Sequence, residues 1–118
     1  MKDTLAPGIE ATETHTVTAG QLAAHVPVLS TPNMILLIEE TCIRLLAQHS
    51  DEGEISVGTH VCVSHVGGAN EGEEVTIHVK LTEKDRRRCT FDVEVNGPSG
   101  VMSEGTHQRA VVDAARFG

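Results

Sequence analysis

Four runs of alternating apolar and polar side chains fill most of residues 55–112, and this period of two is the pattern of β-strands with one buried face. Short turns separate the later runs, including Asn96-Gly97, a dipeptide typical of tight connections between antiparallel strands. The last run alternates less regularly, and Gly105 within it is a candidate β-bulge. The runs are 55–65, 75–81, 89–95 and 101–112. The alternation predicts an antiparallel sheet with one face on a core.

One helical segment precedes these strands. Thr31-Pro32 is a helix-start signature, because Pro fixes φ at the first helical position and the preceding hydroxyl can cap free N–H groups. In the segment NMILLIEETCIRLLAQH that follows, side chains on one face recur at helical spacing: Ile35, Ile38, Cys42, Leu45, Leu46 and His49. A short strand is expected at 14–19. This order predicts an α+β fold in which a curved antiparallel sheet wraps around one long central helix.

The size of the chain limits what this fold can contain. Its 118 residues suit one domain, 1–118, and its only aromatic residues are Phe91 and Phe117. The core must therefore be built from aliphatic side chains. The chain also has no apolar run long enough to span a bilayer and no signal-peptide pattern, so we expect a soluble, cytoplasmic protein with no membrane partner.

Charge and cysteine content narrow the function classes. A formal net charge of −8 argues against nucleic acid as a partner, since binding a polyanion normally requires a basic face. Cys42, Cys62 and Cys89 show no CxxC spacing and lie in apolar segments, so we interpret them as core thiols in a reducing compartment. The turn EKDRRR is a locally basic exception, which is either a solvated hairpin tip or an edge that binds phosphate groups.

A metal site is not expected. The sequence has no HExxH motif or Cys/His cluster, and the strand GTHVCVSH places His60 and His65 at positions of opposite parity. Two histidines on opposite faces of a regular strand cannot bind one metal ion. His65 shares its face with Val61 and Val63, which predicts that it points toward the helix, whereas His60 points to the surface or an interface.

Three residues have the chemistry of a small hydrolytic site. Glu39 falls inside the apolar stripe of the helix, whereas Glu40 lies on the opposite side near Arg44. Glu39 and His65 would thus face one apolar layer as an acid/base pair. The Thr31 hydroxyl lies at the helix N-terminus, where the helix dipole favours a developing anion. Structural roles also fit these residues: a satisfied histidine, a boundary carboxylate and a helix cap.

The segments EETCIRLL, GTHVCVSH and GTHQRAVV, with Phe117 after the last, occur in an order and at a spacing that resemble the fluoroacetyl-CoA thioesterase family of hot-dog fold proteins. The resemblance extends from about Thr14 to Phe117. It implies an acyl-CoA thioesterase that needs no cofactor and forms a homodimer with active sites near the interface. The catalytic residues it implies are Thr31, Glu39 and His65, and the substrate-binding residues are Gly58 and Arg109.

The chain departs from this family between the first strand and the helix. Fluoroacetyl-CoA thioesterases have a longer, Phe-bearing lid there, whereas the segment AAHVPVLSTPN is short and lacks aromatic residues. This difference favours a small or short-chain acyl group other than fluoroacetyl. Two alternative functions are a non-catalytic module that binds acyl-CoA or a small apolar ligand, and an enoyl-thioester hydratase, which also uses a carboxylate and a histidine.

Overall fold

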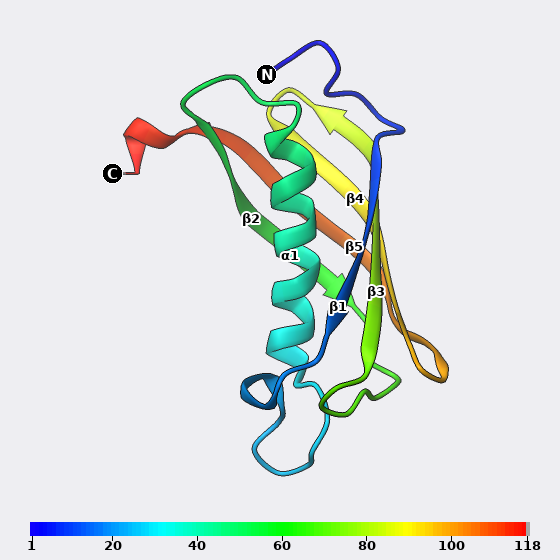
Figure 1. Ribbon diagram of the computed structural model, residues 1–118. Helices are drawn as coiled ribbons and strands as arrows, with labels where there is room; N and C mark the ends of the chain where they lie inside the picture. The colour runs from blue at the N-terminus through cyan, green and yellow to red at the C-terminus, as the bar shows by residue number, and fades with distance from the viewer. Residues whose placement is uncertain (118) are drawn as a thin grey trace.

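A computed structural model describes residues 1–117, and Gly118, the last residue of the predicted domain, lies outside them. One long helix lies across a strongly curved sheet, as Figure 1 shows. The elements in chain order are β1 Glu10–Thr16, η1 Ala19–Gln21, α1 Thr31–Ala47, β2 Glu54–Val63, β3 Glu74–Asp85, β4 Arg88–Gly97, β5 Gly100–Asp113 and η2 Ala114–Arg116. The predicted fold class is confirmed, although the first strand begins at Glu10 rather than at residue 14. Among the described residues, no helix has the length and apolarity that crossing a bilayer requires.

The sheet is antiparallel throughout, with the strand order β1-β3-β4-β5-β2. The alternation predicted for β3 and β4 is confirmed, since their inward residues are buried: Val75, Ile77, Val79, Leu81, Cys89, Phe91, Val93 and Val95. The helix buries Met34, Leu37, Ile38, Thr41, Cys42, Leu45 and Leu46 against them. The core is therefore aliphatic apart from Phe91, and β2 remains at the edge of the sheet.

A β-bulge near the middle of β2 changes which residues face the helix. Gly58 pairs with Arg109, but His60 pairs with the next residue back on β5, so Thr59 is the extra residue. Before the bulge the even-numbered residues face inward, because Ser56 pairs with the buried Val111. After it the odd-numbered residues face inward. The expectation that odd residues face the helix along the whole strand is therefore wrong before the bulge, where Ile55 is exposed.

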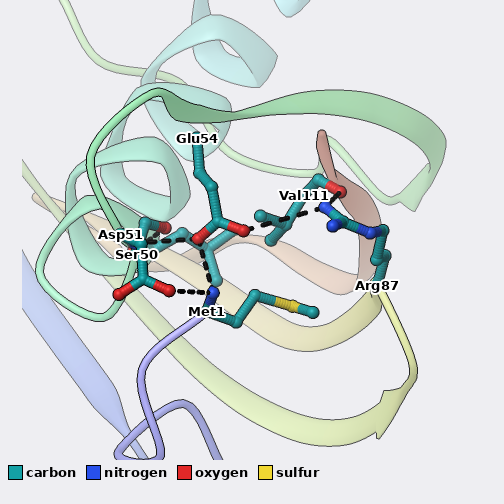
Figure 2. Close-up of polar contacts among 7 residues, drawn as sticks. Met1, Ser50, Asp51, Glu54, Arg87 and Val111 are labelled. Carbon is teal, nitrogen blue, oxygen red and sulfur yellow. Dashed lines mark hydrogen bonds and ion pairs between the residues drawn. The ribbon is translucent and has the colours of Figure 1, made fainter. Parts of the chain in front are cut away.

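An ion-pair cluster joins distant segments at the end of the molecule near the C-terminus of α1 (Figure 2). The Met1 ammonium lies 2.6 Å from carboxylate oxygens of both Asp51 and Glu54. Glu54 also lies 3.7 Å from the Arg87 guanidinium, which donates a hydrogen bond to the carbonyl oxygen of Val111. The hydrogen bond from the ammonium lowers the pKa of Glu54. This cluster fixes the N-terminal segment and the β3–β4 turn to the start of β2.

Gly105 does not form the predicted β-bulge. It pairs in register with Val93 on β4 and with Val63 on β2, while the β4–β5 register shifts instead between Val95 and Asn96. A Cβ atom at Gly105 would clash with the carbonyl oxygen of Cys62. A glycine is therefore required here because the backbones of β5 and β2 approach closely.

We predict that Gly105→Ala destabilises the protein by about 3 kcal/mol or more, since the added methyl group must displace the backbone of β2. Urea unfolding followed by circular dichroism measures this change. Gly20→Ala is the matched control, because its added methyl group meets no atom within 4 Å. Equal stability of the two variants would contradict the close approach of the strands.

Candidate functional site

Thr31 and His65 form a hydrogen-bonded pair at the N-terminus of α1. The Thr31 Oγ1 atom lies 2.6 Å from His65 Nδ1. Thr31 is free to make this contact because Ser30, not Thr31, is the N-cap: its hydroxyl accepts a hydrogen bond from the backbone N–H of Asn33. The capping role considered for Thr31 is therefore wrong. The Thr31 hydroxyl is instead held against an imidazole nitrogen that can accept its proton.

A cavity of about 410 Å³ opens beside this pair. Its walls come mainly from the segment between β1 and α1, together with Thr31 and His65: Ala23, Ala24, His25, Val26, Val28, Leu29, Ser30 and Pro32. A bridge between Leu22 and Leu29 and a hydrogen bond from Leu29 N–H to the carbonyl of Ala69 hold this segment in place. The lining is largely aliphatic and contains no Phe, Tyr or Trp, so it suits a small apolar group next to the Thr31 hydroxyl and the His65 imidazole.

Glu39 and Arg109 form the second part of the site. The Arg109 side chain is only 3% exposed, and its Nη1 atom lies 3.3 Å from Glu39 Oε2. The guanidinium also donates from Nε to Ser56 Oγ at 2.9 Å and from Nη2 to the Ser56 carbonyl at 3.0 Å. A buried guanidinium needs such partners because leaving its charge unpaired inside the protein would cost several kcal/mol, roughly 3–5. These contacts fix the carboxylate and the cation relative to β2 and β5.

Gly58 lies directly over this ion pair. A Cβ atom at this position would be 2.8 Å from Glu39 Oε2 and 3.3 Å from Arg109 Nη1. The missing side chain thus leaves room for the carboxylate at the strand. The structure brings Gly58, Glu39 and Arg109 together, and the bulge at Thr59 gives Gly58 an inward position that the later part of β2 assigns to odd-numbered residues.

Sequence reasoning missed His107, which completes the second group. His107 is fully buried, its Nδ1 lies 2.8 Å from the His60 carbonyl oxygen, and its Nε2 lies 3.2 Å from Arg109 Nη1. Burial lowers the pKa of His107, and the neighbouring Arg109 charge lowers it further, although the hydrogen bond to the His60 carbonyl opposes this shift. The signal was available, since residues 107 and 109 have the same parity on one strand.

Ser103 is a second polar residue that sequence reasoning missed. Its side chain is fully buried, and within residues 1–117 its Oγ atom has no hydrogen-bond partner. The β2–β5 pairing continues beyond β2, with Ser64 N–H bonded to the Glu104 carbonyl and Val66 N–H to the Met102 carbonyl. This register places Ser103 opposite His65. An unsatisfied buried hydroxyl therefore lies on the strand beside the Thr31–His65 pair.

The two groups do not join within one chain. Thr31 and Glu39 lie eight residues apart on α1, which is about 12 Å along the helix axis at 1.5 Å per residue. Among the described residues, Glu39 contacts Arg109 and His65 contacts Thr31, and the predicted Glu39–His65 pair is not formed. One chain thus holds a hydroxyl–imidazole pair at one place and a carboxylate–guanidinium pair two helical turns away.

Other polar and reactive groups do not add to these two. The part of the chain that the structure describes contains no cluster of three potential metal ligands. Burial raises the pKa of the Cys42 thiol to about 12, so this thiol stays protonated. Cys89 is also buried, but Cys62 is exposed, which corrects the interpretation of Cys62 as a core residue.

A second, larger hollow of about 490 Å³ is lined mainly by polar and charged side chains of β3, β4 and β5, including Lys80 and Glu104. It lacks the Thr31–His65 pair.

The comparison with known proteins identifies the family. The model of the fluoroacetyl-CoA-specific thioesterase family matches residues 11–115. The chain is 33% identical over 90 residues to the fluoroacetyl-CoA thioesterase of Streptantibioticus cattleyicolor, a match that covers 76% of this chain and 65% of that protein. The chain thus spans slightly less than two thirds of this relative.

Solved structures agree with this match. A variant of the fluoroacetyl-CoA-specific thioesterase in complex with fluoroacetate and CoA superposes with a TM-score of 0.92 at 28% identity, covering 97% of this chain and 100% of the other. A Thermus thermophilus thioesterase superfamily member has the same fold, with a TM-score of 0.88 at 21% identity over 96% of this chain and 88% of the other. The fold, the family match across residues 11–115 and the relative's identity agree: the chain belongs to the fluoroacetyl-CoA-specific thioesterase family.

Proposed function

We propose that the chain is a single-domain acyl-CoA thioesterase with Thr31, Glu39 and His65 as its catalytic residues. The observation that carries the proposal is the 2.6 Å contact between the Thr31 hydroxyl and His65 Nδ1, at the wall of an aliphatic cavity. This pair is a nucleophile and a base within hydrogen-bonding distance. The activity of the family, and the fluoroacetate and CoA bound in one solved relative, support a CoA thioester as the substrate.

In the proposed reaction, His65 Nδ1 takes the proton of the Thr31 hydroxyl as the oxygen attacks the thioester carbonyl carbon. The carbon–sulfur bond then breaks, CoA leaves as a thiol with the proton from His65, and the acyl group remains on Thr31. Water, deprotonated by His65, then attacks the carbonyl carbon of this ester. The bond between the acyl carbon and Thr31 Oγ1 breaks, the carboxylic acid leaves, and His65 returns the proton to the threonine oxygen. The positive end of the α1 dipole lies beside the reacting carbonyl and stabilises its developing negative charge.

Glu39 has a supporting role in this scheme. Because its carboxylate oxygen is held by Arg109, direct attack on the substrate would require this ion pair to break. We therefore assign to Glu39 the polarisation and orientation of the reacting groups, rather than formation of an anhydride. Arg109 and the open space at Gly58 bind the substrate next to it.

We further propose that the protein is a homodimer in which each complete site takes Thr31 and His65 from one subunit and Glu39, Gly58 and Arg109 from the other. The separation of the two groups within one chain supports this arrangement. The unpaired edge of β2 supports it too, since a long edge strand needs a partner. Exposed apolar side chains on β2 and α1 are also available to a partner: Val61 at 39%, Leu36 at 47% and Ile43 at 41%.

The substrate we propose is a CoA ester of a small acyl group, and fluoroacetyl-CoA is not specifically favoured. The cavity lining between β1 and α1 has Val26, Val28 and Leu29 but no Phe, Tyr or Trp ring to close over a fluorinated carbon. The three free cysteines fit a reducing compartment, which supports a cytoplasmic location. In the basic turn, Arg87 and Arg88 already form ion pairs with Glu54 and Asp85, so phosphate binding there would compete with these contacts.

We predict that Thr31→Ala, His65→Ala and Glu39→Gln each lower kcat/KM for a short-chain acyl-CoA by about 100-fold or more, which is the usual effect of removing a general base or nucleophile. Release of free thiol from a panel of short acyl-CoA esters, followed with a colorimetric thiol reagent, measures this loss. Thr31→Ser should keep measurable activity because it retains the hydroxyl.

Glu40→Gln is the matched control for Glu39→Gln, because it removes the neighbouring carboxylate on α1, whose charge lies near Arg44. It should keep wild-type activity. Circular dichroism must confirm that each variant folds. Stabilisation by acyl-CoA without thiol release would favour the binding module, and loss of enoyl absorbance without thiol release would favour the hydratase.

The composite site gives a separate prediction. Thr31→Ala and Glu39→Gln homodimers are each inactive, but a mixed dimer has one site with both substitutions and one site with neither. After subunit exchange between equal amounts of the two variants, we expect about one quarter of the wild-type activity. Light scattering should give twice the 12.6 kDa mass of one chain. Exchange without any recovery of activity would show that each site lies within one subunit.

A further inference from the structure

The two ring nitrogens of His107 have partners that fix its protonation state. The His60 carbonyl oxygen can only accept a hydrogen bond, so Nδ1 must carry a proton. The Arg109 guanidinium can only donate, so Nε2 must present its lone pair. One neutral tautomer of the imidazole satisfies both contacts at once. The doubly protonated ring would place a second positive charge 3.2 Å from Arg109 Nη1.

The same contact determines where the Arg109 guanidinium lies. Its Nη1 atom has two hydrogens, and the two acceptors within reach are His107 Nε2 and Glu39 Oε2. Ser56 holds the Nε and Nη2 side of the group. Without the imidazole, Nη1 would lose its acceptor on the β5 side. The guanidinium could then pivot about its two contacts with Ser56 and move Nη1 toward the carboxylate. The carboxylate lies where a side chain at position 58 would stand, since a Cβ atom there would be only 2.8 Å from Glu39 Oε2.

We propose that His107 is a positioning residue: its neutral imidazole fixes the Arg109 guanidinium so that Glu39 lies in its reactive place beneath Gly58. This inference rests on the proposed function, since it assigns His107 a role in that same site. His107 itself is buried beneath the site and need not touch the substrate. It acts through Arg109, and the backbone of β2 at His60 sets its orientation.

His107→Gln and His107→Leu form the test pair. A glutamine amide can donate to the His60 carbonyl and accept from Arg109, whereas leucine fills similar space and removes both of these hydrogen bonds, leaving Arg109 only its contacts with Ser56 and Glu39. We expect His107→Leu to lower kcat for thiol release at least about 10-fold with KM changed less than about 3-fold, because an interaction made in the transition state is lost. His107→Gln should stay within about 3-fold of wild type in kcat.

A pH profile separates positioning from support of the fold. The charged or titratable groups around the ring are Glu39 on α1, Arg109 on β5 and His60 on β2, and the neighbour on β4 is the uncharged Phe91. The pKa of His107 is lowered in the folded protein, so its stabilising contacts are complete at neutral pH and are lost as the pH falls through that lowered value. Both proteins share the general base, and only wild type has the His107 imidazole, so wild type should lose more kcat on acidification than folded His107→Gln does.

An activity-independent measurement completes the experiment. Nitrogen-15 NMR of the wild type should show His107 as the Nδ1–H tautomer at neutral pH, and the Arg109 Nε–H signal should be kept in His107→Gln and shifted or lost in His107→Leu. If folded His107→Leu keeps the wild-type kcat and Arg109 signal, His107 is only structural and the proposal is wrong. If wild type releases no thiol while the NMR results hold, the proposed function fails and the positioning of Arg109 stands.

Discussion

The burial of the Arg109 charge is the constraint on which the contact between α1, β2 and β5 depends. A guanidinium that is 3% exposed must find its partners inside the protein, and it takes them from three elements: Glu39 of α1, Ser56 of β2 and His107 of its own strand. The distance between helix and sheet, the bulge in β2 and the absence of a side chain at Gly58 all satisfy this requirement together. Removing the side chain of Glu39, Ser56 or His107 would take away one of the partners of this buried charge.

The helix serves the site in two ways because its ends differ. At its N-terminus, Ser30 takes over the capping of Asn33 N–H, which releases the next hydroxyl, that of Thr31, to contact His65. Two turns later, the Glu39 side chain is 32% exposed and forms an ion pair with Arg109. Between these positions Leu37 and Ile38 are buried in the core. The rigid helix thus sets a fixed spacing between the hydroxyl and the carboxylate.

The sequence allowed much of this arrangement to be predicted, for reasons that depend on periodicity. The strict alternation in β3 and β4 predicted their buried faces, and the isolated carboxylate in the helical stripe identified Glu39. Periodicity failed at β2, because a bulge changes parity by one residue and no residue type marks Thr59 as the extra one. The Thr31-Pro32 pattern also placed the cap one residue too late, because Ser30 has a hydroxyl group that can do the same.

The residues that pattern reasoning missed are those whose role depends on contacts between strands. His107 contacts a carbonyl on β2 and a guanidinium on its own strand. The shared parity of residues 107 and 109 indicates the second contact, but the first depends on how β2 and β5 pair. The separation of Thr31–His65 from Glu39–Arg109 is likewise a property of the folded chain. Each pair forms its own contact within one chain, so neither needs the other for the fold to form. Assembly of the proposed dimer would therefore join two groups that are already ordered, and the chemistry could be lost by separating subunits without unfolding either one.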